Sequence, residues 1–197
     1  MEIFDVVNDW QVYGLNESIR ASKYPKSVDI RSLGCEVTNT VKKLAGCQTG
    51  TGHDQFLTGI VVQFDLTLSI KAWTEAERYH FLDFVSSQST MHCIAKFDAE
   101  KQCNEYVHPA TVGVVKGHLE CYNEEPTPEN YLRLLYNIPT GFRLTARMTT
   151  NYRQLKTIYQ QRKNHRLPEW RTFCEWISYL PYAKDFIIGK DGTDEGI

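Results

Sequence analysis

The segment that most constrains the fold is Ile60–Ile70, in which apolar and polar side chains alternate. Successive side chains of a β-strand point to opposite faces of the sheet, so this alternation predicts a strand with one apolar face. The apolar set consists of Val62, Phe64, Leu66, Leu68 and Ile70. This segment is the clearest strand of the chain.

Shorter patterns predict the other elements. Apolar runs predict strands at Ile3–Val7, Trp10–Tyr13 and Phe142–Met148. Helical spacing and helix-start residues predict helices that begin at Asn16, Cys35, Thr74, Tyr131, Tyr152 and Pro168. The first of these stops at Pro25, and the next three end near Leu44, Val85 and Tyr136. The fifth runs to Arg162, and the last has Trp170, Phe173, Cys174 and Ile177 on its apolar face.

Two local signals fix helix starts in these predictions. Thr74 followed by Glu77 matches a capping box, in which hydroxyl and carboxylate satisfy each other's free backbone amides. Pro168 suits a first helical position, because a proline there loses no hydrogen bond. Two further stretches predict loops, glycine-rich at 46–52 and polar at 86–90. The stretch from Asp98 to Asn130 is the least regular, and we expect helical fragments there, separated by Pro109, Pro126 and Pro128.

Size and composition indicate one globular domain. The chain has 197 residues, 42% hydrophobic and 23% charged, which is close to the average for folded proteins. Strands and helices together predict a single α+β domain over residues 1–188, followed by a polar tail at 189–197 that frays.

Charge and cysteine usage limit the partners and the compartment. The net charge of −2 argues against a general nucleic-acid or membrane-surface binder, since such proteins carry a basic excess. The chain shows neither a run of apolar residues long enough for a membrane span nor a signal peptide, so we expect a cytoplasmic protein. The six cysteines form no C-x-x-C pair, which favours scattered buried thiols over disulfides or a metal site.

The most informative chemistry lies where a strand leads directly into a helix. Thr149, Thr150 and Asn151 are an N-cap cluster, and free amides at a helix N-terminus favour an anion. Arg153 in the first turn opposes the helix dipole, which suggests a ligand for it to hold. Pairing of Arg153 with a nearby carboxylate is the alternative.

Two further groups of basic residues have a similar double interpretation. Arg162, His165 and Arg166 lie at the far end of the same helix, where cations also compensate the dipole. Arg78 and His80 are candidates for anion binding, or simply part of a solvated face with Glu75 and Glu77.

The order of these residues resembles a known signature. Ile138-Pro139, a strand, Thr149, Asn151, Arg153 and finally Arg162 align without a gap with the C-terminal signature of the flavin-dependent thymidylate synthases. Gly52-His53, the strand that follows it, and residues 19–23 resemble further stretches of that family, in the same order.

The resemblance implies a fold, an activity and an assembly. It implies a central, mostly antiparallel sheet packed with helices, a homotetramer, FAD as cofactor and dUMP as the nucleotide that receives a one-carbon unit at C5. It also implies that Asn151 and Arg153 contact the flavin, and that Arg162 contacts the uracil and stabilises charge developing on the ring.

The family's defining motif is degenerate in this chain. The motif reads Arg-His-Arg-x-x-Ser-x-Asn-Glu-x-Ser-x-Arg-Tyr, and it falls on residues 78–91. Arg78 and a basic His80 remain, but Asp83 replaces the serine and Thr90 the last arginine. That motif grips the dUMP phosphate, which requires cationic donors, so the phosphate clamp is rewritten here.

Three functions therefore stay open from the sequence. One is a divergent synthase that binds a dUMP-like pyrimidine nucleotide and FAD. The second is a non-catalytic protein that binds or sequesters a nucleotide, or inhibits a partner protein. The third is a purely structural oligomer, which would bind no small molecule. The candidate catalytic residue is Arg162. The candidate cofactor-binding residues are His53, Arg78, His80, Asn151 and Arg153. The candidate substrate-binding residues are Glu75, Ser86, Gln88, Arg162 and His165. No metal site is expected.

Overall fold

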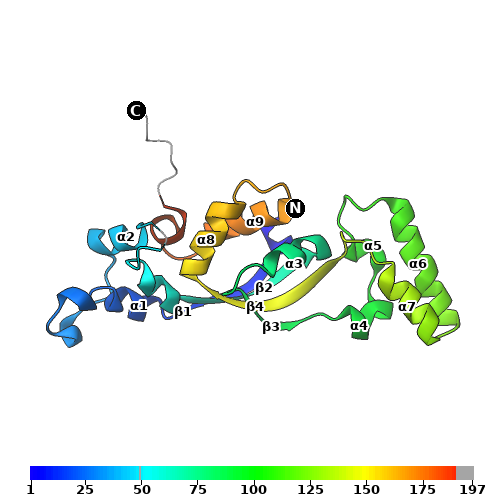
Figure 1. Ribbon diagram of the computed structural model, residues 1–197, viewed down its shortest axis with the longest axis horizontal. Coiled ribbons are helices and arrows are strands. Elements are labelled where there is room, and N and C mark those ends of the chain that lie inside the picture. The colour runs from blue at the N-terminus through cyan, green and yellow to red at the C-terminus, as the bar shows by residue number, and fades with distance from the viewer. Residues whose placement is uncertain (49, 190–197) are drawn as a thin grey trace, which may run out of the picture.

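A computed structural model describes residues 1–48 and 50–189. Its centre is one antiparallel sheet of four strands in the order β1-β2-β4-β3 (Figure 1). The strands are β1 (Val7–Tyr13), β2 (Val61–Ser69), β3 (Asp83–Ser87) and β4 (Arg143–Asn151). Together with the helices, this sheet confirms the α+β fold class and the antiparallel sheet.

Helices make up most of the remaining structure. They are α1 (Leu15–Ala21), α2 (Asn39–Ala45), α3 (Ile70–Ala76), α4 (Thr90–Cys93), α5 (Ala99–Gln102), α6 (Pro109–Glu124), α7 (Pro128–Tyr136), α8 (Tyr152–Arg162) and α9 (Pro168–Ile177). A π-helix follows at Lys184–Ile188. Short 3₁₀ turns lie at Ile3–Asp5, Tyr24–Lys26, Ile30–Ser32, Gln55–Gly59 and Ile94–Lys96.

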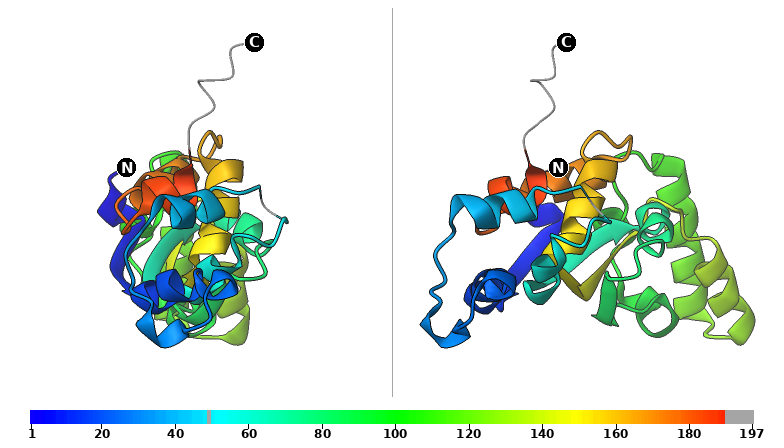
Figure 2. Two further views of the ribbon diagram at one scale, coloured as in Figure 1. Left: turned by 90° about the vertical axis from the view of Figure 1, so that its left-hand side faces the viewer. Right: turned by 60° about the vertical axis from the view of Figure 1, so that its left-hand side comes forward.

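The main core lies between the sheet and α8 and α9, which cover one sheet face (Figures 1 and 2). Phe64 of β2 pairs in register with Met148 of β4, and both side chains are fully buried. The ring of Phe64 packs 4.7 Å from that of Trp176 in α9, centroid to centroid. The strand with one apolar face that the alternation predicted is confirmed, because the apolar side chains of β2 lie in this core.

A second hydrophobic cluster lies at the other end of the sheet, where α4 to α7 gather (Figure 1). Phe142 and Leu134 are buried there. The helical fragments predicted at 98–130 are present as α5 and α6, but the stretch is more regular than expected, because α6 alone has 16 residues. The prolines that suggested breaks stand instead at helix starts: Pro109 opens α6 and Pro128 opens α7.

The predicted capping box at Thr74 is also wrong. The helix α3 begins earlier, and the Ser69 hydroxyl caps it by accepting from the Ala72 amide at 3.2 Å. Thr74 lies inside the helix and donates to the Lys71 carbonyl at 2.8 Å. The helix ends at Ala76 rather than near Val85, and β3 forms where helix was expected because pairing with β4 satisfies its backbone.

Smaller boundary differences have local causes. Residues 3–5 form a 3₁₀ turn rather than a strand, and β1 is one continuous strand through a bulge at Asp9, whose φ is 44°. The helix α2 begins at Asn39 rather than Cys35, because the Thr38 hydroxyl caps it. The predicted helix at 131–136 starts at Pro128, and the polar loop predicted at 86–90 begins only after β3.

The last third of the chain agrees best with the sequence. Helix α8 has the predicted bounds, and Asn151 caps it by accepting from the Gln154 amide at 2.9 Å, while Thr149 and Thr150 belong to β4. Helix α9 begins at Pro168 as predicted. All four side chains predicted for its apolar face are buried. The tail predicted at 189–197 lies outside the described residues from 190 onward.

Candidate functional site

The buried guanidinium of Arg162 is the centre of the candidate site. Arg162 is the last residue of α8, and only 6% of its surface is exposed. Its Nε donates to the Tyr79 hydroxyl at 2.7 Å, and its Nη1 donates to Glu75 Oε2 at 2.6 Å. The guanidinium carbon lies 4.9 Å from the ring centroid of Trp170 in α9, a cation–π distance. Side chains from α3, from α9 and from the segment between α3 and β3 thus fix one cation.

His165 completes this group from the loop between α8 and α9. Its Nε2 lies 3.1 Å from Glu75 Oε2 and 2.8 Å from Arg162 Nη1, and its Nδ1 accepts from the Leu167 amide at 3.2 Å. Because Nδ1 accepts, the neutral ring carries its proton on Nε2, facing Glu75 Oε2. In this tautomer His165 Nε2 and Arg162 Nη1 are both donors that share Glu75 Oε2, and the contact between them is not a hydrogen bond.

Desolvation lowers the pKa of His165, and the positive charge of Arg162 lowers it further, against an opposing effect of Glu75. The ring is therefore neutral near pH 7. We call Glu75, Tyr79, Arg162 and His165 the Arg162 cluster. The structure brings three predicted site residues, Glu75, Arg162 and His165, into one contact network.

Tyr79 is the member that sequence reasoning missed. Its hydroxyl also donates to Gln161 Oε1 at 3.0 Å, and its ring is buried. Tyr79 stands between Arg78 and His80 in the sequence, and the two basic neighbours were selected as candidates instead of the tyrosine. In the structure those neighbours point to solvent, while the tyrosine between them enters the core.

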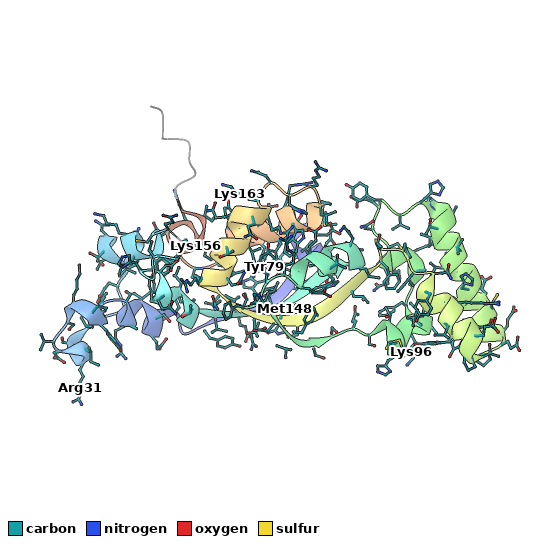
Figure 3. The ribbon with its side chains drawn as sticks, in the orientation of Figure 1. Arg31, Tyr79, Lys96, Met148, Lys156 and Lys163 are labelled. Atoms are coloured by element: carbon teal, nitrogen blue, oxygen red, sulfur yellow. The ribbon has the colours of Figure 1, made fainter. Side chains whose placement is uncertain are left out.

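A second network lies in the first half of α8, away from the Arg162 cluster at its end. The Asp54 carboxylate is fully buried and accepts from Arg153 Nε at 3.1 Å and from Lys156 Nζ at 3.1 Å. Lys156 also donates to the carbonyls of Ala45 and Cys47, at 2.7 and 2.6 Å. In Figure 3, Lys156 marks this Asp54 cluster and Tyr79 marks the Arg162 cluster.

The Asp54 cluster shows the partner of Arg153. Its Nε bonds to Asp54 and its Nη1 donates to Gln55 Oε1 at 2.9 Å, so the cation in the first turn of α8 is compensated within the chain. The same contacts hold the loop of His53 against α8, and His53 itself is exposed. Arg153 therefore contacts the loop that carries His53, while Asn151 caps the start of the same helix. Asp54 and Lys156 were not predicted as parts of a network. The acidic residue directly after Gly52-His53 was the only sequence feature that pointed to Asp54.

The remaining candidates lie toward β3. Arg78 and His80 are exposed in the segment between α3 and β3. Ser86 lies on β3 opposite Arg147, and Gln88 Oε1 accepts from the Thr145 amide at 2.9 Å. Asp83, which stands where the motif has serine, is exposed on the same strand.

The cysteines and possible metal ligands add little to the site. All six cysteines are free, and Cys103 and Cys174 are buried while Cys35 and Cys121 are exposed, so the expectation of buried thiols holds only in part. Burial raises the pKa of the Cys174 thiol to about 12. Among the described residues, no cluster of histidine, cysteine or acidic side chains could hold a metal ion. In the same part of the chain, no helix has the length and apolarity to cross a membrane.

Comparison with known proteins places the fold. No family model matches the chain, and no curated protein matches it by sequence. Among solved structures, the flavin-dependent thymidylate synthase ThyX from Helicobacter pylori, complexed with FAD and dUMP, is similar with a TM-score of 0.69 and 18% identity. That match covers 94% of this chain and 98% of the other.

A second kind of enzyme shares the same architecture. The UMP/dUMP methylase PolB from Streptomyces cacaoi, bound with 5-Br dUMP, matches with a TM-score of 0.62 and 13% identity, over 90% of this chain and 91% of the other. The chain therefore has the fold seen in the flavin-dependent thymidylate synthase ThyX and in a UMP/dUMP methylase, over nearly its whole length.

Proposed function

We propose that this chain binds a pyrimidine nucleotide of the dUMP type, with the Arg162 cluster facing the base. The observation that carries the proposal is the position of Arg162: Tyr79 and Glu75 fix its Nε and Nη1, and among the described residues no hydrogen bond engages its Nη2. A uracil edge presents carbonyl acceptors beside an N–H donor. A guanidinium next to a carboxylate offers the complementary pair, which supports Arg162 and Glu75 as substrate-binding residues.

The same arrangement suits chemistry at C5 of the ring. A fixed cation stabilises negative charge that develops on a ring oxygen, and it needs no rearrangement during the reaction. Arg162 is therefore our proposed catalytic residue. His165, neutral near pH 7, would hold the Glu75 carboxylate through its Nε2 proton. Ser86 and Gln88 are proposed to contact the rest of the nucleotide.

For the cofactor we propose FAD. The donors present fit an anionic flavin nucleotide, because Arg153 keeps 28% of its side chain exposed and the amide nitrogen of Asn151 can donate while its oxygen caps α8. His53, Arg78 and His80 are exposed cationic or donor groups that would complete the binding surface. When bound, FAD supplies the redox chemistry of one-carbon transfer; the protein binds and orients.

The second candidate is a non-catalytic protein that binds or sequesters a nucleotide, or inhibits a partner. Two observations favour it. Arg153 is already bonded to the buried Asp54, and the strand that carries the degenerate motif exposes Asp83 where a phosphate needs donors. Formation of dTMP from dUMP with reduced FAD and a methylene donor, followed by mass spectrometry, separates the two candidates.

As the assembly we propose a homotetramer. Helices α8 and α9 cover one face of the sheet (Figure 1). The charged side chains of Asp65 and Arg147, which alternate with the buried ones along β2 and β4, are partly exposed. They are available to another copy of the chain. Light scattering coupled to size-exclusion chromatography measures the mass directly, and a monomer at micromolar concentration would contradict this part of the proposal.

Titration calorimetry with dUMP tests the nucleotide site. We expect Arg162→Lys to weaken dUMP binding about tenfold or more, because lysine cannot keep the paired contacts of a guanidinium. Arg166→Lys is the matched control, since Arg166 lies in the following loop and is exposed. Equal dUMP affinity of the Arg162→Lys variant and the wild type would remove the cluster from the nucleotide site.

A further inference from the structure

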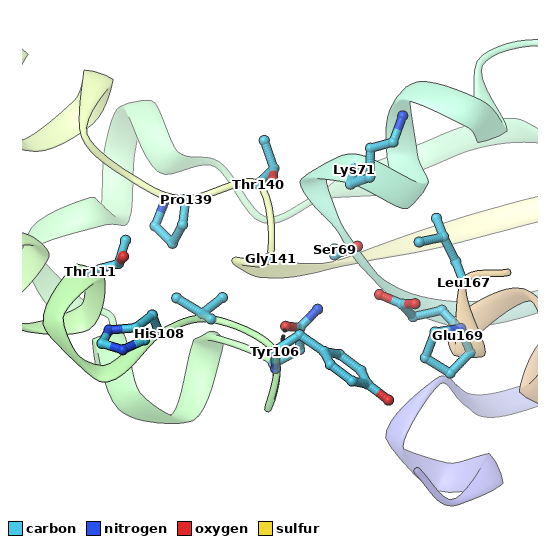
Figure 4. Close-up of a pocket in the computed structure, with 13 residues that line it drawn as sticks. Ser69, Lys71, Tyr106, His108, Thr111, Pro139, Thr140, Gly141, Leu167 and Glu169 are labelled. Atoms are coloured by element: carbon cyan, nitrogen blue, oxygen red, sulfur yellow. Dashed lines mark hydrogen bonds between the residues drawn. The ribbon is translucent and has the colours of Figure 1, made fainter.

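A pocket of about 390 Å³ lies beside the Arg162 cluster and is not used by the proposed nucleotide site. It is bounded by the start of α3, the segment before α6, the turn at residues 139–141 and the first turn of α9 (Figure 4). Its volume falls within the range of pockets that hold small molecules. Lys71 at its edge connects it to the cluster, because Lys71 Nζ lies 3.6 Å from Glu75 Oε1.

The pocket is lined by a buried carboxylate, one oxygen of which is buried without a hydrogen-bond partner among the described residues. Glu169 lies in the first turn of α9 with 1% of its surface exposed. Within the described residues, no donor lies within hydrogen-bond distance of its Oε1 atom. Figure 4 shows the carboxylate directed from α9 into the pocket, toward the side of Ser69 and Gly141. A buried acceptor without a donor is unfavourable, and almost all such groups in proteins find a partner.

The rest of the lining indicates the shape of the missing partner. Val107, Pro139 and Leu167 are apolar walls, and the Tyr106 ring is exposed at the border. His108 Nδ1 accepts from the Ala110 amide at 3.1 Å, so its ring proton is on Nε2 and can be donated. Apolar walls around one buried acceptor suit a small, flat group that carries N–H donors on one edge.

We propose that this pocket binds a second small ligand, distinct from the pyrimidine nucleotide, which presents paired N–H donors to the Glu169 carboxylate. Two chemical groups have this donor pattern: the N1–H and 2-amino edge of a guanine-type heterocycle, and a guanidinium. Both match the two oxygens of a carboxylate. The inference stands on Glu169 and the pocket, and it does not require that the proposed nucleotide site is correct.

The test is a titration of the ¹⁵N-labelled chain with guanosine, inosine and methylguanidinium chloride, followed by amide chemical shifts. We expect guanosine to shift the Thr140 and Gly141 amides. Inosine lacks the 2-amino donor and should bind more weakly. A response to methylguanidinium without one to guanosine assigns the site to a guanidinium ligand and still supports paired N–H donors. The loss of one hydrogen bond to a charged acceptor corresponds to about tenfold or more in affinity.

The variants decide whether Glu169 is responsible. Glu169→Gln should weaken the binding probe about tenfold or more, while Glu175→Gln, an exposed position on the same helix, should bind it as the wild type does. If Glu169→Gln does not fold, Thr111→Trp fills the pocket from its α6 side and should abolish the shifts. Absence of any shift with guanosine and methylguanidinium in the millimolar range overturns the proposal, because Glu169 is then satisfied by water alone. Shifts that persist unchanged in both variants overturn it as well.

A dUMP titration keeps this result separate from the proposed function. Glu169→Gln should bind dUMP with wild-type affinity. Loss of guanosine or methylguanidinium binding alone then concerns the second pocket, and loss of dUMP binding in Arg162→Lys alone concerns the nucleotide site.

Discussion

The Nη1 atom of Arg162 lies 2.6 Å from Oε2 of Glu75, and this ion pair joins the last residue of α8 to α3. Both side chains are mostly buried, with 7% and 20% exposed. A pair at this depth is weakly screened by solvent, and removal of one partner leaves a buried charge uncompensated. The contact therefore affects stability as well as the proposed nucleotide site.

Glu75→Ala should accordingly lower the free energy of unfolding by about 2–3 kcal/mol. Urea denaturation followed by tryptophan fluorescence measures the change. Glu77→Ala, two residues further on and exposed, is the control and should stay within about 0.5 kcal/mol of the wild type. Equal free energies of unfolding for the two variants would show that the Glu75–Arg162 ion pair does not stabilise the fold.

The Asp54 cluster predicts a larger effect. Lys156 is only 9% exposed, and Asp54→Ala leaves its ammonium group without the carboxylate that compensates it. The same substitution removes the partner of Arg153. We expect a loss of about 3–5 kcal/mol in the free energy of unfolding. Asp83→Ala, at an exposed position of β3, serves as the control, with little effect expected. A loss below about 1 kcal/mol for Asp54→Ala contradicts the buried network.

The corrected start of α3 can be tested with a pair of small substitutions. Ser69→Ala removes the hydroxyl that caps the Ala72 amide and should cost about 1 kcal/mol. Thr74→Ala removes a hydroxyl that bonds back to the Lys71 carbonyl within the helix, and it should be near neutral. Thermal or urea denaturation of both variants gives the ranking, and the reverse ranking would restore Thr74 as the cap.

The lowered pKa of His165 predicts a pH dependence of stability. Since the folded chain holds this ring neutral and the unfolded chain does not, the unfolded state binds more protons as the pH falls below the ordinary value of 6.5. The contribution of His165 is thus fully present above pH 6.5 and is lost as the pH falls through its folded pKa. His165→Asn keeps an acceptor for the Leu167 amide and removes the titration.

Urea denaturation at a series of pH values between 7.5 and 5 measures this contribution. The free energy of unfolding of the wild type should fall more steeply over that range than that of His165→Asn. Parallel curves for the two proteins would mean that the ring titrates alike in the folded and unfolded chain.

The sequence predicted the parts of the fold whose signals are local. The alternation of β2 and the Asn151 cap of α8 depend on neighbouring residues, and both appear as expected. The capping-box pattern at Thr74 failed because two serine or threonine residues competed to start α3, and the sequence did not show which one lay at the end of β2. Prolines at 109 and 128 were ambiguous between breaking a helix and opening one.

The candidate site was predictable only in part for a different reason. Glu75, Arg162 and His165 were each predicted as site residues, but not the contacts between them. Glu75 and Arg162 are 87 positions apart in the sequence, and no local pattern encodes a contact over that separation. Tyr79 and Asp54 were missed because their roles depend on burial. Glu169 is the second residue of α9, and an acidic residue in a first helical turn is common, so nothing in the sequence was a reason to select it.

The most direct test of the account is the visible absorption spectrum of the freshly purified chain, with mass spectrometry of what heat releases from it. We predict a yellow protein that releases FAD, or that takes up added FAD, and in which Arg153→Ala reduces the bound flavin. A colourless protein that FAD cannot reconstitute would contradict the flavin site, and another nucleotide in the released fraction would instead identify the ligand of a non-catalytic binding protein.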